Sequence, residues 1–195
     1  MPMKNKIKKP KLSQIEKPNE VQGRDLFQTP NYALDILLPY IPSKITEIWD
    51  CAAGKGKIVD YFTVGADYTS FGTDIIGEYT FNFITDAMST IRTKTAIITN
   101  PPYSLKRKFY QKCREYKIPF ALLIPTDYCL WLINAIRIDG CEKIIPDRRI
   151  DFITPSGKSG KESGAAFHSM WLTWGFGLGQ TETFVNLTND MKKNI

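Results

Sequence analysis

Apolar positions along this chain follow two periods, which predict that helices and strands alternate. Helical spacing of leucine and isoleucine predicts a helix over 31–41, and Thr29 and Pro30 form a typical helix start before it. Three further segments have the same helical pattern, at 57–64, 105–117 and 128–138. Short apolar and β-branched runs predict strands over 45–50, 68–75, 81–87, 93–100, 120–127, 142–153 and 166–176.

This alternation predicts an α/β domain built on a mostly parallel sheet. The last two strands differ, because a polar loop rather than a helix separates them, and they are expected to form an antiparallel hairpin at the end of the sheet. Residues 23–195 are expected to form a single domain that is long enough to enclose a core. The lysine-rich residues 1–22 have no period and are predicted to be a flexible tail.

Composition and charge narrow the class of protein. Hydrophobic residues make up 43% of the 195 positions, yet no uninterrupted apolar run reaches the length of a membrane span, so we expect no membrane partner. Four cysteines lie far apart without a CxxC pair, which argues against zinc and favours reduced thiols in a cytoplasmic protein. The basic N-terminus lacks the apolar segment of a secretory signal. The net charge of +6 is compatible with a nucleic-acid partner.

Polar residues stand where several of the predicted strands end. Asp50, Asp74, Asp86 and Asn100 each close or follow an apolar run. In open α/β sheets, ligands bind beyond the carboxyl ends of the strands. These four residues are therefore predicted to share one site.

The segment DCAAGKG, at 50–56, reads as a glycine turn between a strand and a helix. Gly54 and Gly56 allow the backbone to approach a ligand closely. The segment matches neither the P-loop nor the dinucleotide fingerprint, so no phosphate cradle is expected. The structural alternative is a turn that only connects two elements.

The acids around this turn indicate the kind of ligand. A carboxylate at Asp50 suits an ammonium group, and Asp74 is placed to accept hydrogen bonds from a ribose diol. Asp86 is a candidate acceptor for an adenine amino group. S-adenosylmethionine carries an amino-acid ammonium group, a ribose and an adenine without any phosphate, and it is the cofactor that these residues predict.

The segment NPPY, at 100–103, suits a site that acts on an exocyclic amine. Such an amine is a poor nucleophile because its lone pair is delocalised into the ring. The side-chain oxygen of Asn100 and the carbonyl of Pro101 can each accept one N–H and favour a more tetrahedral nitrogen. Pro101 and Pro102 fix this geometry beforehand, and Tyr103 offers a face to a base taken out of its stack. The structural alternative is a Pro-Pro turn with a packing tyrosine.

Together these motifs resemble class I S-adenosylmethionine-dependent methyltransferases, most closely the N6-adenine DNA methyltransferases with γ-type motif order, including small phage-type enzymes. The resemblance covers roughly residues 25–176. It implies a Rossmann-like sheet, transfer of a methyl group to the N6 amine of a flipped adenine in DNA, and a bacterial or phage-infected cytoplasm. The matching segments are FQTP (27–30), DCAAGKG (50–56), Asp74, Asp86, NPPY (100–103) and 152–175.

The resemblance also implies roles for individual residues. Phe27, Thr29 and Pro30 are expected at the methionine part of the cofactor, and Phe167 at the second face of the flipped base. Lys158 and Lys161, in the polar loop, are expected to contact a nucleic-acid backbone. The predicted catalytic residues are Asn100, Pro101, Pro102 and Tyr103. The predicted cofactor-binding residues are Phe27, Thr29, Pro30, Asp50, Ala52, Gly54, Gly56, Asp74, Ile75, Asp86 and Ala87.

The sequence departs from the family pattern at three points and leaves alternatives open. Cys51 stands where proline is frequent, Lys55 stands where a small residue is common, and no separate target-recognition domain of family length follows Ile153. An RNA base amine or a protein glutamine presents the same N–H groups as adenine. A catalytically silent nucleic-acid-binding homologue is a further alternative. The target sequence, the choice between adenine and cytosine, the oligomeric state and any partner subunit for recognition stay open.

Overall fold

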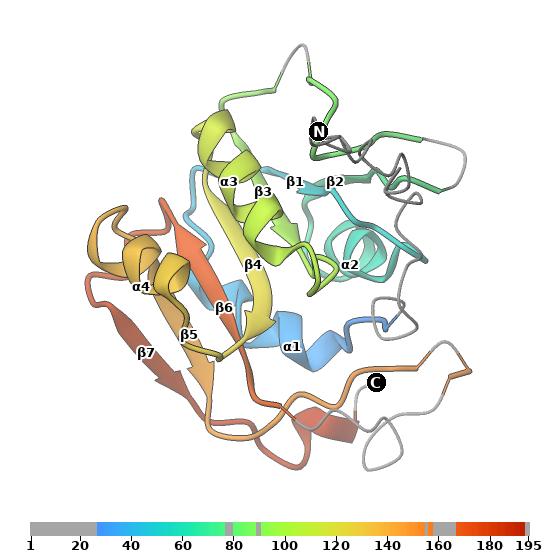
Figure 1. Ribbon diagram of the computed structural model, residues 1–195. Coiled ribbons are helices and arrows are strands. Elements are labelled where there is room, and N and C mark those ends of the chain that lie inside the picture. Colours follow the sequence, from blue (N-terminus) through green and yellow to red (C-terminus); the bar gives the residue numbers. More distant parts are fainter. Residues whose placement is uncertain (1–26, 77–79, 89–90, 155, 158–166, 194–195) are drawn as a thin grey trace, which may run out of the picture.

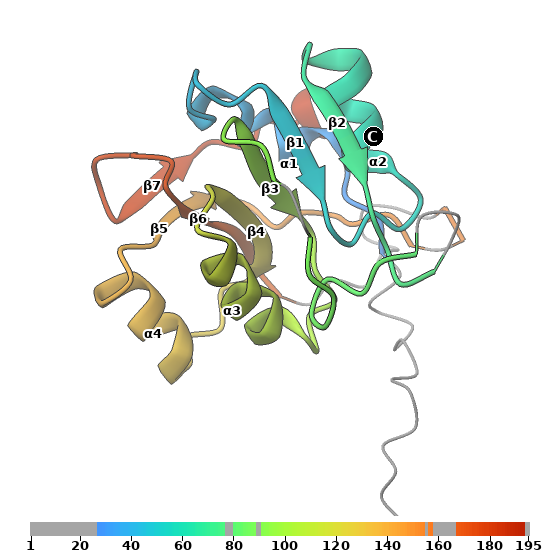
Figure 2. The same cartoon turned by 90° about the horizontal axis from the view of Figure 1, so that it is seen from above.

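The computed structural model describes residues 27–76, 80–88, 91–154, 156–157 and 167–193. The predicted basic tail at 1–22 and the two loop residues Lys158 and Lys161 lie outside these described residues. The described part of the chain forms a mixed α/β fold around one sheet, with helices on both of its faces (Figures 1 and 2).

The sheet has seven strands in the order β2-β1-β3-β4-β6-β5-β7. Strands β1 to β4 run parallel to one another, and β7 runs parallel to β5. Strand β6 is antiparallel to both of its neighbours, so the mostly parallel sheet and the antiparallel pairing of the two late strands are confirmed. The pair does not lie at the end of the sheet as predicted, because β7 pairs with β5 at that edge. The strands are β1 Glu47–Asp50, β2 Thr69–Gly72, β3 Thr95–Thr99, β4 Phe120–Pro125, β5 Glu142–Pro146, β6 Ser169–Trp174 and β7 Glu182–Val185.

Helices cover both faces of the sheet, which separates the core into two layers (Figure 2). On one face lie α1 (Asn31–Asp35) and α2 (Lys57–Asp60), which a π-helical turn continues over Tyr61–Gly65. On the other face lie α3 (Lys106–Tyr116) and α4 (Leu130–Arg137). Among the described residues, no helix has both the length and the apolar character needed to cross a bilayer.

Each central strand contributes side chains to both core layers, because successive side chains point to opposite faces of a sheet. In β1, Ile48 packs toward α1 and α2, whereas Trp49 packs toward α3. Strand β4 is buried on both faces, which explains why its sequence is a continuous apolar run rather than an alternating one. This burial fixes the positions of the strand ends, and therefore of the polar residues that follow them.

Two predicted helices are shorter or less regular than their sequences suggest. The predicted helix over 31–41 ends as an α-helix at Asp35, and a 3-10 turn, η2, spans Leu38–Tyr40. Pro39 accounts for this break, because it has no N–H to donate and disfavours the helical conformation of the residue before it. In the predicted helix over 57–64, the second half adopts π-helical rather than α-helical hydrogen bonding.

The prediction of a strand over 81–87 is wrong, because this segment forms a turn. The side-chain oxygen of Asn82 accepts hydrogen bonds from the backbone N–H groups of Ile84 and Thr85, at 3.1 and 3.4 Å. The Asp86 carboxylate accepts the N–H of Asn82 at 2.8 Å. Such local side-chain bonds to the backbone compete with the ladder of a sheet. Asp86 therefore lies in a turn and not at the end of a strand.

Gly72, the last residue of β2, lies where the side chains of Ala53 and Val59 leave no room for a Cβ atom. A Cβ atom built at this position would lie 2.6 Å from the Cβ of Ala53 and 3.0 Å from Cγ2 of Val59. We expect Gly72→Ala to lower the free energy of unfolding by about 1–3 kcal/mol, because overpacking forces its neighbours apart. Denaturant unfolding measures this change. Gly65→Ala is the control, since a Cβ there meets nothing within 4 Å, and an equal loss in both variants would contradict the prediction.

Candidate active site

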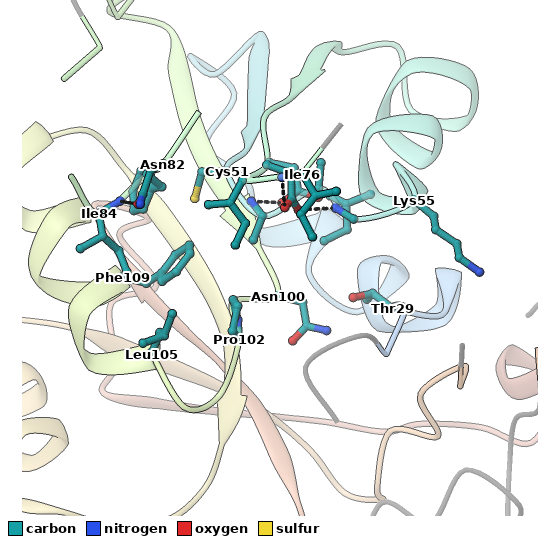
Figure 3. Close-up of a pocket in the computed structure, with 18 of the residues that line it drawn as sticks. Thr29, Cys51, Lys55, Ile76, Asn82, Ile84, Asn100, Pro102, Leu105 and Phe109 are labelled. Carbon is teal, nitrogen blue, oxygen red and sulfur yellow. Dashed lines mark hydrogen bonds between the residues drawn. The ribbon is translucent and has the colours of Figure 1, made fainter. Parts of the chain in front are cut away.

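A pocket of about 540 Å³ lies at the carboxyl ends of the parallel strands β1, β2 and β3 (Figure 3). Its walls come from segments that are far apart in the sequence but converge at this edge of the sheet. The segments that contribute lining residues are 27–29, 50–58, 74–76, 82–85 and 100–109. The pocket therefore collects most of the segments that the sequence singled out.

Asp50 is the last residue of β1 and is almost completely buried in the wall of this pocket. Its Oδ1 atom accepts hydrogen bonds from the Thr99 hydroxyl at 2.6 Å and from the backbone N–H of Ala52 at 3.2 Å. Burial raises the pKa of the Asp50 carboxyl to about 7, and the neighbouring Asp74 adds to this rise, while the two hydrogen bonds oppose it. A cation in the pocket would favour the ionised form of Asp50.

Asp74 holds the glycine turn in place from the segment that follows β2. It lies two residues beyond the end of β2, and its Oδ2 atom accepts the backbone N–H of Gly54 at 2.8 Å. Its Oδ1 atom accepts the N–H of Ile76 at 3.3 Å. Gly54 and Gly56 both have a positive φ, of 52° and 80°, which is the conformation that favours glycine. The turn is thus shaped by its glycines and tied to Asp74.

Asn100 follows β3 directly, and its side chain points into the pocket between Pro102 and Thr29 (Figure 3). The Oδ1 atom of Asn100 is buried, and within the described part of the chain it has no hydrogen-bond partner. A buried acceptor without a partner typically costs about 1–3 kcal/mol. The arrangement therefore suits a ligand that brings an N–H donor to this atom.

Tyr103 and Phe167, which were predicted to lie on the two faces of a flipped base, contact each other in the structure. Their ring centroids are 5.3 Å apart and their planes meet at 77°, so the contact is edge to face. Phe152 completes this aromatic group, with its ring centroid 6.1 Å from that of Tyr103. No role was predicted for Phe152, because it falls within the segment 142–153 that was predicted to be a strand. None of the three rings is a lining residue of the pocket itself.

The predicted site residues divide into those that line the pocket and those that do not. Pro30 lies buried before α1, Gly56 precedes α2, and Asp86 and Ala87 belong to the turn that follows residue 81. Pro101 is buried within the NPPY segment. These five residues do not line the pocket. The predicted residues that do are Phe27, Thr29, Asp50, Ala52, Gly54, Asp74, Ile75, Asn100 and Pro102.

Several lining residues were not predicted from the sequence. Phe83 and Phe109 stack with ring centroids 5.0 Å apart and form an apolar wall. The helical spacing of α3 places Phe109 on the buried face of that helix, which is the one signal that marked it. The other unpredicted lining residues include Gln28, Lys55, Lys57, Asn82 and Lys108.

Two polar groups of this pocket can bind a ligand, the Asp50 carboxyl group and the Asn100 side-chain oxygen. Asp50 is a buried carboxyl group that a cation would ionise, and Asn100 supplies an acceptor for an N–H group. Apolar and aromatic side chains form much of the remaining wall. Neither a scan against protein-family models nor a search of curated protein sequences finds a match to this chain.

Proposed function

We propose that this protein transfers a methyl group from S-adenosylmethionine to the N6 amine of adenine in DNA, as a class I methyltransferase with a Rossmann-like sheet. The observation that carries the proposal is the buried Oδ1 atom of Asn100, which has no hydrogen-bond partner among the described residues and belongs to a residue that lines the same pocket as Asp50. A site for an amine substrate needs such an acceptor, and a site for this cofactor needs a group that receives a cation. The sheet order and the mostly parallel strands are compatible with the proposal.

The residues of the pocket fit the parts of S-adenosylmethionine. The Asp50 carboxylate is the partner for the ammonium group. Asp74 keeps acceptor capacity for ribose hydroxyls beyond its two backbone hydrogen bonds, since an ionised carboxylate has about four lone-pair sites. The apolar wall at Phe83 suits the adenine ring. When bound, the cofactor supplies a methyl group on a positively charged sulfur, which is an electrophile.

The NPPY residues prepare the amine for attack. Asn100 Oδ1 and the Pro101 carbonyl accept the two N–H groups of the amine, which directs its lone pair away from the base ring. Because the prolines hold both acceptors before the substrate arrives, little reorganisation is needed during the reaction. The amide oxygen of Asn100 is a weak base, so we expect the amine proton to leave to water.

Tyr103 and Phe167 are proposed to hold the flipped base between their rings. In the structure the two rings touch edge to face, with centroids 5.3 Å apart. A base stacked between parallel rings needs them about 7 Å apart, which is twice the stacking distance of about 3.4 Å in duplex DNA. Binding of the base therefore requires Tyr103 and Phe167 to separate and reorient. Stacking on an aromatic ring contributes about 1–3 kcal/mol per base, which offsets part of this cost.

Mass spectrometry of methylated products tests the proposal directly. Duplex DNA, single-stranded DNA, RNA and protein are incubated separately with the protein and labelled S-adenosylmethionine. N6-methyladenine in DNA supports the proposed function. Methylated cytosine, methylated RNA or methylated glutamine would replace the proposed substrate. Cofactor binding without transfer to any of these substrates would instead identify a catalytically silent homologue.

Two exposed lysines at the pocket are expected to contact phosphates of the substrate strand. Lys57 is the first residue of α2 and Lys108 lies in the first turn of α3, and both line the pocket. Affinity for duplex DNA falls as the salt concentration rises, so a plot of log affinity against log salt has a negative slope. We expect the double variant Lys57→Ala/Lys108→Ala to make this slope less steep by about 1.8, or about 0.9 for each lost contact. Fluorescence anisotropy at several salt concentrations measures this slope.

The control for this experiment lies at the opposite edge of the sheet. Lys44 and Lys94 are also exposed, but they precede β1 and β3 and are therefore at the amino ends of the strands. Lys44→Ala/Lys94→Ala removes the same charge and should leave the slope unchanged. Equal slopes for both double variants would show that the pocket lysines do not face the substrate backbone.

A further inference from the structure

Thr99 connects the two halves of the candidate site. It is the last residue of β3, is completely buried and directly precedes Asn100. Its hydroxyl donates a hydrogen bond of 2.6 Å to Oδ1 of Asp50 on the neighbouring strand. The residue therefore joins the strand that ends in the amine acceptor to the carboxyl group expected to bind the cofactor.

We propose that Thr99 is a positioning residue for the cofactor: its hydroxyl holds the Asp50 carboxylate ionised and oriented to receive an ammonium group. This inference rests on the function proposed above, because it takes S-adenosylmethionine as the ligand of Asp50. Thr99 was not among the site residues predicted from the sequence.

The two hydrogen bonds to the Asp50 carboxylate fall on the same oxygen atom. The Thr99 hydroxyl and the Ala52 N–H both reach Oδ1, and in the described part of the chain no partner contacts Oδ2. The carboxylate thus has one oxygen held by the protein and one left for a ligand. Hydrogen bonds to a charged group are stronger than those between neutral groups, so loss of the hydroxyl should disfavour ionisation.

The surroundings of Asp50 on balance disfavour its ionised form. Burial raises the pKa of its carboxyl group, and Asp74 raises it further because it carries the same charge. Cys51, the adjacent titratable group, is buried and its own pKa is raised well above the usual value, so it stays a neutral thiol. The opposing contributions come from Thr99 and from the N–H of Ala52, with Thr99 the larger. Thr99 is therefore the main side chain that favours the charge.

A matched hydrogen bond at the other end of the same two strands allows a strict comparison. Thr95, the first residue of β3, donates to Oε1 of Glu47 at 2.6 Å, and both residues are buried. Glu47 also pairs with Arg92 at 2.8 Å and lies at the amino edge of the sheet, away from the pocket. The two threonines thus make the same kind of bond, but only Thr99 acts on a residue of the site.

The test compares three variants, Thr99→Val, Thr99→Ser and Thr95→Val. Calorimetry measures the affinity for S-adenosylhomocysteine, which carries the same ammonium group, from about pH 5.5 to 8.5. In Thr99→Val we expect affinity at pH 7 to fall about tenfold or more, and the pH at which affinity is half lost to rise by about one unit. Thr99→Ser should restore most of the affinity, and Thr95→Val should keep the wild-type pH profile.

Unfolding without ligand provides a second measurement that does not depend on the cofactor. The folded state holds the Asp50 proton more tightly than the unfolded state, because its pKa is raised from 3.8 to about 7. The contribution of Asp50 to stability is therefore present below about pH 4, is lost as the pH rises to about 7, and is constant above that. Thr99→Val should extend this loss to higher pH, and Thr95→Val should not.

The outcomes separate this inference from the proposed function. A wild-type protein that binds no S-adenosylhomocysteine would overturn the proposed function, and this inference with it. Binding by the wild-type protein, together with an unchanged pH profile in Thr99→Val, would overturn the inference alone. An equal shift in Thr99→Val and Thr95→Val would do the same, because it would reflect a general effect of losing a buried hydroxyl.

Discussion

Replacement of Asn100 by alanine is expected to slow methyl transfer about 10²–10³-fold while cofactor affinity changes little. The variant removes one of two acceptors that orient the amine, and the loss of one such preorganised contact typically has an effect of this size. The cofactor is expected to keep its affinity because Asp50 and Asp74 stay in place on β1 and after β2. Single-turnover methylation of a DNA duplex, with cofactor binding measured separately, tests both halves of this prediction.

Two further variants sharpen the experiment on Asn100. Asn100→Asp keeps an oxygen acceptor of the same shape and should retain more activity than Asn100→Ala. Ser169→Ala is the control, because the Ser169 hydroxyl is also buried without a partner among the described residues but does not line the pocket. Wild-type rates in Asn100→Ala would mean that NPPY is only a structural turn and that the proposed function is wrong.

Replacement of Asp50 by alanine is expected to weaken cofactor binding by about 2–4 kcal/mol, which corresponds to roughly 30- to 700-fold. The side chain is buried, and an ammonium group bound beside it would lose its only charged partner from the end of β1. Calorimetry with S-adenosylmethionine measures the change. Unchanged affinity in a folded Asp50→Ala protein would remove Asp50 from the cofactor site.

The control for Asp50 is at the other end of the same strand. Glu47→Ala also removes a buried carboxylate from β1, and it breaks hydrogen bonds to Thr95 and Arg92. It should lower stability without changing cofactor affinity, because Glu47 does not line the pocket. Comparison of the two variants separates the loss of a ligand contact from the loss of a buried acid.

The central strands could be predicted from the sequence because their apolar runs are long and uninterrupted. Strands β1, β3 and β4 are buried on both faces, which leaves a pattern that local sequence alone reveals. Strand β7 was missed because its four residues, of which Glu182 and Phe184 are exposed, acquire a strand conformation only by pairing with β5. The insertion of β6 between β4 and β5 was not predicted either, because strand order depends on pairing across long distances in the chain.

The candidate site was predictable where a polar residue follows a buried strand. Asp50 and Asn100 satisfy this rule, and both line the pocket. Asp86 does not, because the side chain of Asn82 forms a turn where the apolar pattern indicated a strand. Phe152 was missed because its position depends on the bridge between Gln28 and Ile153, whose two backbone hydrogen bonds join segments more than a hundred residues apart.

The position of β6 has a consequence for synthesis of the protein on the ribosome. Strand β4 is complete at Pro125, but the strand that covers its outer edge ends only at Trp174, about 50 residues later. At about 5–20 residues per second, that edge stays unpaired for about 3–10 s. The exposed segment, Phe120–Pro125, is wholly uncharged and is suited to pairing with other chains. Chains that stall in this interval are therefore expected to aggregate through β4.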